Sequence, residues 1–265
     1  MQCMFLRRSK IEYAMTKLSV NLNKIALLRN QRDVGYPDLY KHAMLILKSG
    51  ADGLTVHPRP DERHIRKDDI PLIEKAISDF GREGIEFNIE GYPSEDFIEL
   101  VKASRCDQVT LVPDAPDAKT SDDGWDIEKH GDMLKKVIAD LQNSGKRVSL
   151  FVNPDETSVR DAKKVGANRI EFFTGPFAKA YDIRANSETR RVYEICGGVA
   201  SEVGIEVNAG HDLCLKNLEA FLDTVENCLE VSIGHAITDD ALQYGWKGAV
   251  ERYQEICKKP KIALC

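Results

Sequence analysis

The sequence predicts a (β/α)8 barrel, an α/β fold in which eight parallel strands alternate with eight helices. The chain has 265 residues, which is a normal length for one barrel of this class. Eight short apolar runs, many of them β-branched, recur about every 30 residues, as expected when ~250 residues are divided into eight units. The segments between these runs carry apolar residues at three- and four-residue steps, which is typical of helices with one buried side.

The predicted strands and helices have recognisable limits. The strands are Leu18–Leu22, Gly53–His57, Glu86–Glu90, Gln108–Val112, Arg147–Val152, Arg169–Phe173, Ile205–Asn208 and Leu229–Ile233. Two buried helical stripes consist of Ile70, Ile73, Ile77, Phe80 and of Leu215, Leu218, Leu222, Val225. Ser94 and Asp155 are predicted helix N-caps, and Gly50 and Gly166 stand just past predicted helix ends.

The barrel is expected to form a single domain over residues 15–265. Residues 1–14 are expected to be an N-terminal extension, either disordered or preceding a native start at Met15. The longest polar stretch, Pro113–Asp126, follows the fourth strand at the face where barrel active sites form, which predicts a lid. The alternative is a surface loop without a function.

Composition argues against several classes of function. The formal net charge is −6, whereas binding to a nucleic-acid backbone requires clustered excess Lys and Arg. No apolar run approaches the ~20 residues of a membrane span, and the N-terminus lacks the apolar segment of a secretory signal. The seven cysteines include no CxxC pair, which indicates reduced thiols in a cytoplasmic protein. Cys106 and Cys228 are expected in the core.

Polar residues stand at the ends of several predicted strands, and in this fold the carboxyl ends of all strands meet at one face, where active sites form. These residues are Asn21, Asn23, His57, Glu90, Glu171, Asn208 and His211. Imidazoles and buried carboxyl groups exchange protons near neutral pH, so His57, Glu90 and His211 are candidates for acid-base catalysis. For Glu171, which has apolar neighbours, a structural ion pair is the alternative role.

Two features near these strand ends predict phosphate binding. The loop after His57 carries Arg59, Arg63 and His64, which are anion-binding side chains. Gly-His pairs at residues 210–211 and 234–235 follow the last two strands, where glycine lets backbone N–H groups approach an anion. We expect His235 to hold phosphate or to cap its helix.

Other chemistries have weaker support. A mixed metal site would use His57, Glu90, Glu171 and His211, but the sequence lacks HxH, HExxH and DxD motifs. Lys24 beside the first strand would also oppose a dication. Cys214 lacks an arrangement that would activate a thiol nucleophile. His42 and His130 lie within predicted helices and are expected to have no role in the site.

Six segments carry a family resemblance: NLNKIALLRNQR, ADGLTVHPRPDERHIR, FNIEGYPS, VTLVPDAPDAKTSDDGWD, VNAGHDL and VSIGHAI. From about Thr16 to about Lys258 the chain closely resembles the pyridoxine 5′-phosphate synthase family of vitamin B6 biosynthesis. The resemblance implies condensation of 3-amino-2-oxopropyl phosphate with 1-deoxy-D-xylulose 5-phosphate to give pyridoxine 5′-phosphate, phosphate and water. It implies no organic cofactor and no metal, and it implies a homo-oligomer, expected to be an octamer.

The resemblance also assigns roles to residues of this chain. It implies that His57 and Glu90 accept protons, that His211 donates one, and that Glu171 stabilises charged transition states. The residues implied to bind the aminoketone phosphate are Asn21, Arg32, Gly234 and His235. Those implied to bind the deoxyxylulose phosphate are Arg59, His64 and Thr120, with Asn23 and Lys24 beside them.

The sequence departs from the commonest family pattern in the binding shell. Asn23 and Lys24 stand where Asp and His are usual, and Asp212 stands where glycine usually follows the histidine. We expect Asp212 to turn away from the phosphate and to cap the next helix. These departures keep one alternative function open, a phosphate-binding barrel without catalysis.

Overall fold

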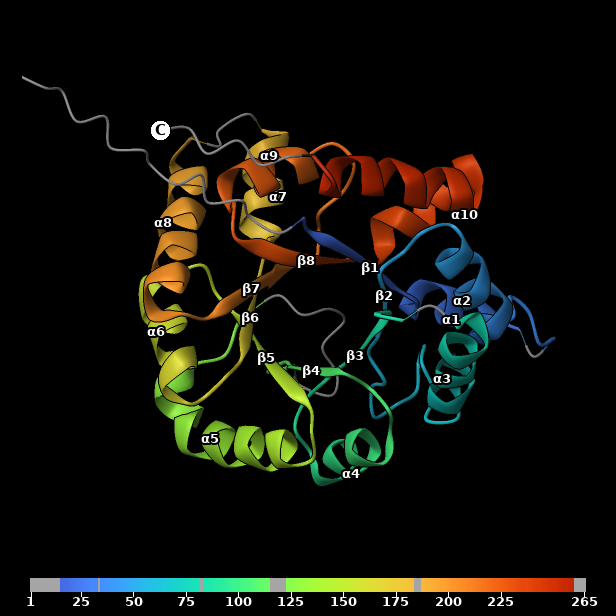
Figure 1. Cartoon of the computed structure of the whole chain (residues 1–265), viewed down its shortest axis with the longest axis horizontal. Coiled ribbons are helices and arrows are strands. Elements are labelled where there is room, and N and C mark those ends of the chain that lie inside the picture. The colour runs from blue at the N-terminus through green and yellow to red at the C-terminus, as the bar shows by residue number, and fades with distance from the viewer. Residues whose placement is uncertain (1–14, 33, 82, 115–122, 184–186, 260–265) are drawn as a thin grey trace, which may run out of the picture.

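The computed structural model describes residues 15–32, 34–81, 83–114, 123–183 and 187–259. Within them, eight strands form a closed barrel in chain order, each paired in parallel with the next, and β8 closes onto β1. Figure 1 shows this barrel end on, with helices around its outside. The predicted (β/α)8 fold class is confirmed.

Every strand boundary lies within one residue of its prediction. The strands are β1 (Lys17–Asn21), β2 (Gly53–Val56), β3 (Glu86–Gly91), β4 (Gln108–Leu111), β5 (Arg147–Val152), β6 (Arg169–Phe172), β7 (Glu206–Ala209) and β8 (Cys228–Ile233). Because all strands run parallel, their carboxyl ends open on one face of the barrel.

The described residues form ten helices rather than the predicted eight, because β1 and β2, and likewise β6 and β7, are joined by two helices each. The helices are α1 (Asn23–Asn30), α2 (Leu39–Lys48), α3 (Asp69–Phe80), α4 (Glu95–Ala103), α5 (Ile127–Asn143), α6 (Glu156–Lys164), α7 (Gly175–Asp182), α8 (Ser187–Val203), α9 (Leu218–Thr224) and α10 (His235–Cys257).

The predicted helix limits are mostly confirmed. The side chains of Ser94 and Asp155 accept hydrogen bonds from backbone N–H groups at the starts of α4 and α6. Gly50 and Gly166 adopt positive φ angles of 107° and 94° after α2 and α6. The stripe from Leu215 was wrong at its start: the side chain of Asn217 closes a turn on the N–H of Cys214, so α9 begins only at Leu218.

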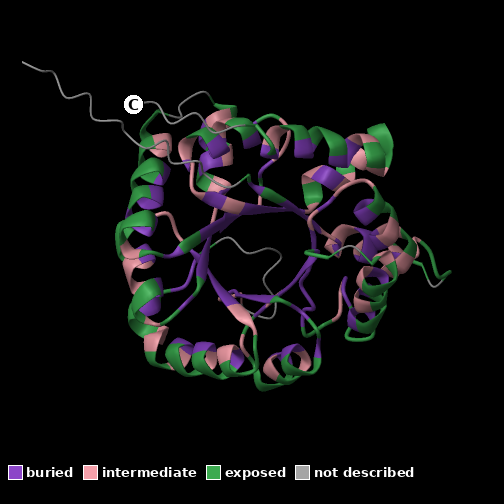
Figure 2. Cartoon of the chain, in the orientation of Figure 1, coloured by how far each residue is buried: buried purple, intermediate pink, exposed green. Residues whose placement is uncertain are grey.

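The strands alternate between two kinds of residue. One set is apolar, faces the helices and includes Leu18, Val20, Leu54, Val56 and Ile89, all completely buried. The other set points into the barrel and is polar through most of its depth, with members Ser19, Thr55, Asn88, Thr110, Ser149, Asn208 and Ser232. The hydrophobic core therefore lies between the sheet and the helices, as the buried colouring in Figure 2 shows.

Polar contacts link these inward side chains across strands. The hydroxyls of Ser19 and Thr55 are 2.7 Å apart, and the hydroxyl of Thr110 donates to the Asn88 side chain at 3.1 Å. Barrels of this class are commonly filled by layers of Val, Ile and Leu. Here the interior is lined by small polar groups instead, and these two pairs join β1 to β2 and β3 to β4 by hydrogen bonds.

Charged residues occupy the amino-terminal end of the barrel interior. Glu86 is paired with Arg147, and Arg169 donates to Glu206 at 2.6 Å. Burial and the nearby charge of Glu86 raise the pKa of Glu230 well above its usual range. In this fold, residues at the amino-terminal end serve stability, so the network belongs to the framework rather than to the active site.

Candidate active site

A cavity of about 520 Å³ opens at the carboxyl ends of the strands. Twelve of the fourteen predicted site residues line it: Asn21, Asn23, Lys24, His57, Arg59, His64, Glu90, Glu171, His211, Asp212, Gly234 and His235. They come from strand ends distributed around the barrel, so the fold brings together groups that are more than two hundred positions apart in the chain.

Two predicted site residues do not line the cavity. Thr120 lies outside the described residues, together with the central part of the predicted lid. The role of Arg32 in binding the aminoketone phosphate stays a prediction, but its side chain is exposed and does not line the cavity. The reason is the length of α1: its eight residues carry the chain about 12 Å from the strand end before Arg32 is reached.

The side chains of His57 and Glu90 lie close together in the wall of the cavity. Nδ1 of His57 lies 3.9 Å from Oε2 of Glu90, and the Asn21 side-chain amide donates to the same oxygen at 3.4 Å. The backbone N–H of His57 donates to Oδ1 of Asn23 at 2.9 Å, and the N–H of Asn23 donates to Oδ1 of Asn21 at 2.9 Å. Asn21 at the end of β1 thus contacts Glu90, and Asn23 at the start of α1 holds the backbone of His57.

The site keeps both groups uncharged. Burial and the positive charge of Arg59 lower the pKa of His57 well below its usual range. Burial and the negative charges of Glu171 and Asp114 raise the pKa of Glu90 well above its usual range. His57 is therefore a neutral imidazole that can accept a proton, and Glu90 is a carboxyl group that holds one.

Glu171 supplies a second buried carboxyl group, 5% exposed, on β6. Burial raises its pKa to about 7, although the nearby charge of His211 lowers it. A carboxyl group with this pKa gains and loses a proton near neutral pH, which is the property required of an acid-base group.

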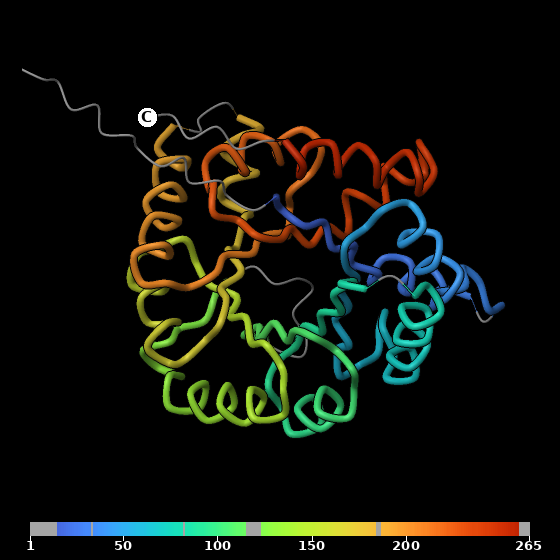
Figure 3. The backbone as a smooth tube through the Cα atoms, in the orientation of Figure 1, coloured from blue at the N-terminus to red at the C-terminus, as the bar shows by residue number. Residues whose placement is uncertain are grey.

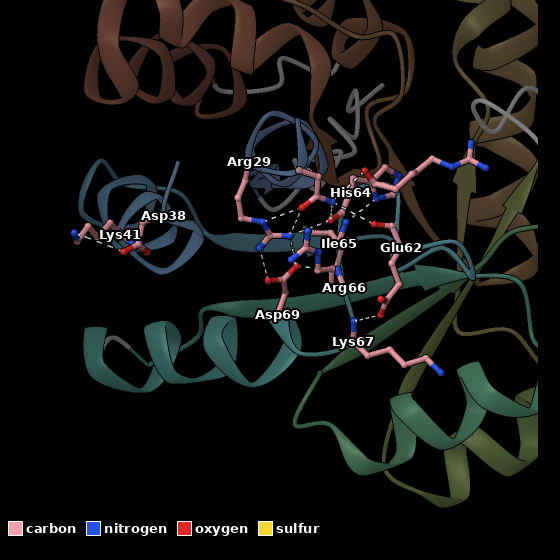
Figure 4. A network of polar contacts seen from close by, with 11 residues as sticks. Arg29, Asp38, Lys41, Glu62, His64, Ile65, Arg66, Lys67 and Asp69 are labelled. Atoms are coloured by element: carbon pink, nitrogen blue, oxygen red, sulfur yellow. Dashed lines mark hydrogen bonds and ion pairs between the residues drawn. The ribbon is translucent and has the colours of Figure 1, made fainter. Parts of the chain in front are cut away.

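The loop between β2 and α3 carries three of the anion-binding residues. Side chains of α1 hold this loop in place by hydrogen bonds. Arg29 donates to Asp69 at 2.9 Å and to the carbonyl of His64 at 3.2 Å, and Asn30 donates to the same carbonyl at 2.8 Å. Figure 4 shows these contacts converging on the loop, with Glu62 bonded to the N–H of Lys67. The loop is therefore a positioned part of the site rather than a loosely solvated one.

Arg59 is buried and paired with Asp114, the first residue after Pro113. Its Nη2 lies 2.6 Å from Oδ2 of Asp114, and the two side chains are 4% and 5% exposed. The guanidinium group of Arg59 thus lines the cavity while its Nη2 is bound by the carboxylate of Asp114. The sequence analysis did not single out Asp114, because a carboxylate in a polar loop gives no sign of its partner.

The ring of His64 has a defined hydrogen-bonding state. Its Nδ1 accepts the N–H of Ile65 at 2.9 Å, and burial with the charge of Arg59 lowers its pKa to about 4. A neutral imidazole that accepts at Nδ1 carries its hydrogen on Nε2. His64 therefore offers a hydrogen-bond donor to a bound phosphate.

His211 and Asp212 form a pair beyond the end of β7. Nδ1 of His211 lies 3.4 Å from Oδ2 of Asp212. The predicted capping role of Asp212 is wrong, because the next helix, α9, begins six residues later and has Asn217 as its N-cap. The carboxylate contacts the preceding histidine instead.

The glycines of the two Gly-His pairs allow close approaches of the chain. A Cβ atom at Gly210 would lie 2.2 Å from the carbonyl oxygen of Ser232, and one at Gly234 would lie 3.1 Å from Cβ of Asn21. Gly234 is the N-cap of α10 and His235 its first residue, so a capping role for the His235 side chain is wrong. The N-terminus of α10 faces the cavity, where it favours an anion.

Several residues that line the cavity were not predicted, because only polar residues at strand ends were considered as candidates. Phe151 at the end of β5 and Phe173 after β6 form an apolar wall, with ring centroids 5.9 Å apart. Their position on the inward side of two strands was a usable signal. Arg63, which the sequence analysis grouped with the loop, also lines the cavity.

Two absences among the described residues bear on other functions. No group of three or more His, Cys, Asp or Glu side chains among them is placed to hold a metal ion. No helix among them is long and apolar enough to cross a membrane.

The fold and the cavity together define a (β/α)8-barrel enzyme with an acid-base site surrounded by anion-binding groups. The model of the family described as pyridoxal phosphate biosynthesis protein PdxJ matches residues 18–259. The chain belongs to this family.

Individual relatives are similar over almost their whole length. The pyridoxine 5′-phosphate synthase of Chelativorans sp. (strain BNC1) is 49% identical over 246 residues, covering 91% of this chain and 98% of that protein. The one from Christiangramia forsetii is 46% identical over 244 residues, covering 92% and 100%.

Solved structures with low sequence identity share the fold alone. The YdjI aldolase from Escherichia coli K12 has a TM-score of 0.61 at 9% identity, covering 93% of this chain and 92% of that one. Tryptophan synthase from M. tuberculosis has a TM-score of 0.57 at 15% identity, with 92% of each chain covered.

Proposed function

We propose that this chain condenses 3-amino-2-oxopropyl phosphate with 1-deoxy-D-xylulose 5-phosphate to pyridoxine 5′-phosphate, the product for which its relatives are named. The observation that carries the proposal is that one cavity brings together three buried titratable groups whose pKa values it moves in different directions. The pKa of His57 is lowered, that of Glu90 is raised well above its usual range, and that of Glu171 is raised to about 7. Groups whose pKa values are moved apart in this way can divide acid and base duties between them.

The chemistry of the reaction requires such a division. An amine attacks a ketone to form an imine, water and phosphate are expelled, and an aldol-like closure forms the ring. Each step moves a proton, and the acid or base must lie about 3 Å from it. In the proposal, His57 takes a proton from the substrates and His211 gives one. Glu90 first gives the proton that it holds and then, as a carboxylate, takes one from the substrates, while Glu171 stabilises the charge that develops.

The binding groups are arranged around this centre. In the proposal, Asn21, Gly234 and His235 hold the aminoketone phosphate at the N-terminus of α10. Arg59 and His64 hold the deoxyxylulose phosphate, with Lys24 adding a positive charge at the start of α1. The apolar wall of Phe151 and Phe173 limits the water around the reacting atoms, which strengthens each of these electrostatic interactions.

Incubation with both phosphorylated substrates tests the proposal. We expect pyridoxine 5′-phosphate, identified by absorbance and mass, and an equal amount of inorganic phosphate. His57→Gln and Glu90→Gln should abolish most product, whereas Asp239→Asn, on the exposed side of α10, should not. Thermal stabilisation by the substrates with no product from the folded wild type would favour the alternative, a binding barrel without catalysis.

We also infer a homo-oligomer, as the family resemblance implies. Apolar side chains that are at least half exposed support it: Leu28, Tyr36 and Leu45 around α1 and α2, and Leu242 on α10. Sedimentation velocity at micromolar concentration should give an assembly, expected to be an octamer, and a monomer would contradict this inference.

A further inference from the structure

The residue after His211 has an unusual backbone conformation. Asp212 has a φ of +63°, in the left-handed region where glycine is favoured and where Asp is tolerated as a single residue. A glycine would fit this turn without strain. The turn itself therefore does not require a carboxyl group at this position.

The carboxylate of Asp212 occupies a defined place. Its Oδ2 lies 3.4 Å from Nδ1 of His211 on one side. On the other side it lies against Gly175, the first residue of α7, where a Cβ atom would come within 3.2 Å of it. The Thr174 hydroxyl donates to the carbonyl of His211 and fixes the turn to the same junction.

We propose that Asp212 is a positioning residue that acts through His211: its carboxylate holds Nδ1 and leaves Nε2 for the cavity as a proton donor. The inference rests on the proposed function, in which His211 donates a proton to the substrate. An imidazole has two nitrogens, and a carboxylate at one of them fixes the ring orientation and stabilises the protonated form.

The surroundings of His211 favour the protonated ring. Burial alone would lower the pKa of His211, but contact with Asp212 and the negative charges of Glu171 and Asp114 raise it. The other basic or titratable groups that line the same cavity are Lys24 from α1, Arg59, Arg63 and His64 from the β2–α3 loop, and His235 from α10. His57, which faces His211 across the cavity, is held neutral by Arg59 and by burial.

Asp212 thereby separates the two histidines by function. His57, beside an arginine, stays neutral and accepts protons, and His211, beside an aspartate, stays charged and donates them. The imidazolium gives its Nε2 proton to the departing oxygen of the substrate and recovers a proton later in the cycle. Loss of the carboxylate would make His211 deprotonate at a lower pH.

Titration of the six histidines by NMR tests the contact without reference to turnover. The full-length protein is labelled at the histidine Cε1, and resonances are assigned with single histidine variants. We expect the pKa of His211 to be about one unit lower in Asp212→Asn, since the lost charge is adjacent but half exposed. Asp212→Gly should lower it equally while relieving the backbone. Asp239→Asn is the control and should leave the titration of His211 unchanged.

The pH dependence of kcat tests the consequence for catalysis. Activity of the wild type should fall at high pH as His211 deprotonates, and in both variants the fall should begin about one pH unit earlier. An unchanged His211 pKa in Asp212→Asn would overturn the proposal, as would a lowered pKa with an unmoved alkaline limb. If the wild type forms no product, the proposed function fails, and the NMR titration still decides whether Asp212 governs His211.

Discussion

Replacement of Glu171 by glutamine is expected to stabilise the protein by an amount that grows between about pH 4.5 and about pH 7. The side chain is 5% exposed, and burial raises its pKa from 4.5 to about 7. In the unfolded chain the carboxyl group ionises near pH 4.5, whereas in the folded protein it stays protonated until about pH 7. The free energy of unfolding therefore falls as the pH rises from 4.5 to 7, and the full cost is reached above pH 7. A pKa difference of this size between the folded and unfolded states corresponds to about 3 kcal/mol in the free energy of unfolding.

Glutamine mimics the protonated carboxyl group, so Glu171→Gln removes this cost. Its advantage over wild type should be near zero at pH 4.5, should grow through neutral pH, and should level off above about pH 8 at about 3 kcal/mol. Urea unfolding at several pH values between 5 and 9 measures it. Glu255→Gln, an exposed carboxyl on α10, is the control and should change stability by less than about 0.5 kcal/mol at any pH.

The outcome for activity should be the opposite. Glu171→Gln cannot stabilise a developing positive charge, so kcat should fall while the free energy of unfolding rises. A stability difference that is independent of pH, or that decreases as the pH rises, would show that Glu171 is ionised in the folded protein at all these pH values. The argument from burial would then be refuted.

Three other changes test separate parts of the site. His57→Gln should lower kcat/KM by about 10²- to 10⁴-fold in steady-state assays with little change in Tm; a smaller loss would contradict its role as a base. Asp114→Asn leaves the buried Arg59 without its counter-charge and should lower the free energy of unfolding by about 3 kcal/mol, measured in urea; an unchanged midpoint would show that the pair contributes nothing. Gly210→Ala places a Cβ atom 2.2 Å from a carbonyl oxygen of β8 and should cost about 1 to 3 kcal/mol, whereas Gly198→Ala in α8, with open space around it, should be neutral or stabilising.

The architecture could be predicted from the sequence because each strand has its own local signal. Runs such as Arg147–Val152 are short and apolar. Their number and regular spacing predict a single eight-stranded barrel. The two additional helices were missed because α1 begins directly after β1, so Asn23 was interpreted as part of a strand end. The chain between Gly175 and Val203 likewise contains two short helical patterns that periodicity alone did not divide.

The site residues at strand ends could be predicted from the sequence. The placement of loop side chains could not, because it depends on contacts between segments that are distant in the chain. His57, Glu90 and Glu171 follow from the parallel barrel, because its geometry brings strand ends together whatever the loops do. The direction of a loop side chain depends on the left-handed turn at residue 212 and on the position of the next helix. For this reason Asp212 was expected at a helix that begins too far away.

The polar lining of the barrel has a consequence for how the strands find their partners. In a parallel sheet that is apolar on both faces, a strand displaced by one residue would still present apolar side chains to each layer. Here the same displacement of β3 would turn Asn88 toward the helices and Phe87 into the barrel. Each such error would bury amide or hydroxyl groups among aliphatic chains, so the alternation itself selects the correct strand alignment during folding.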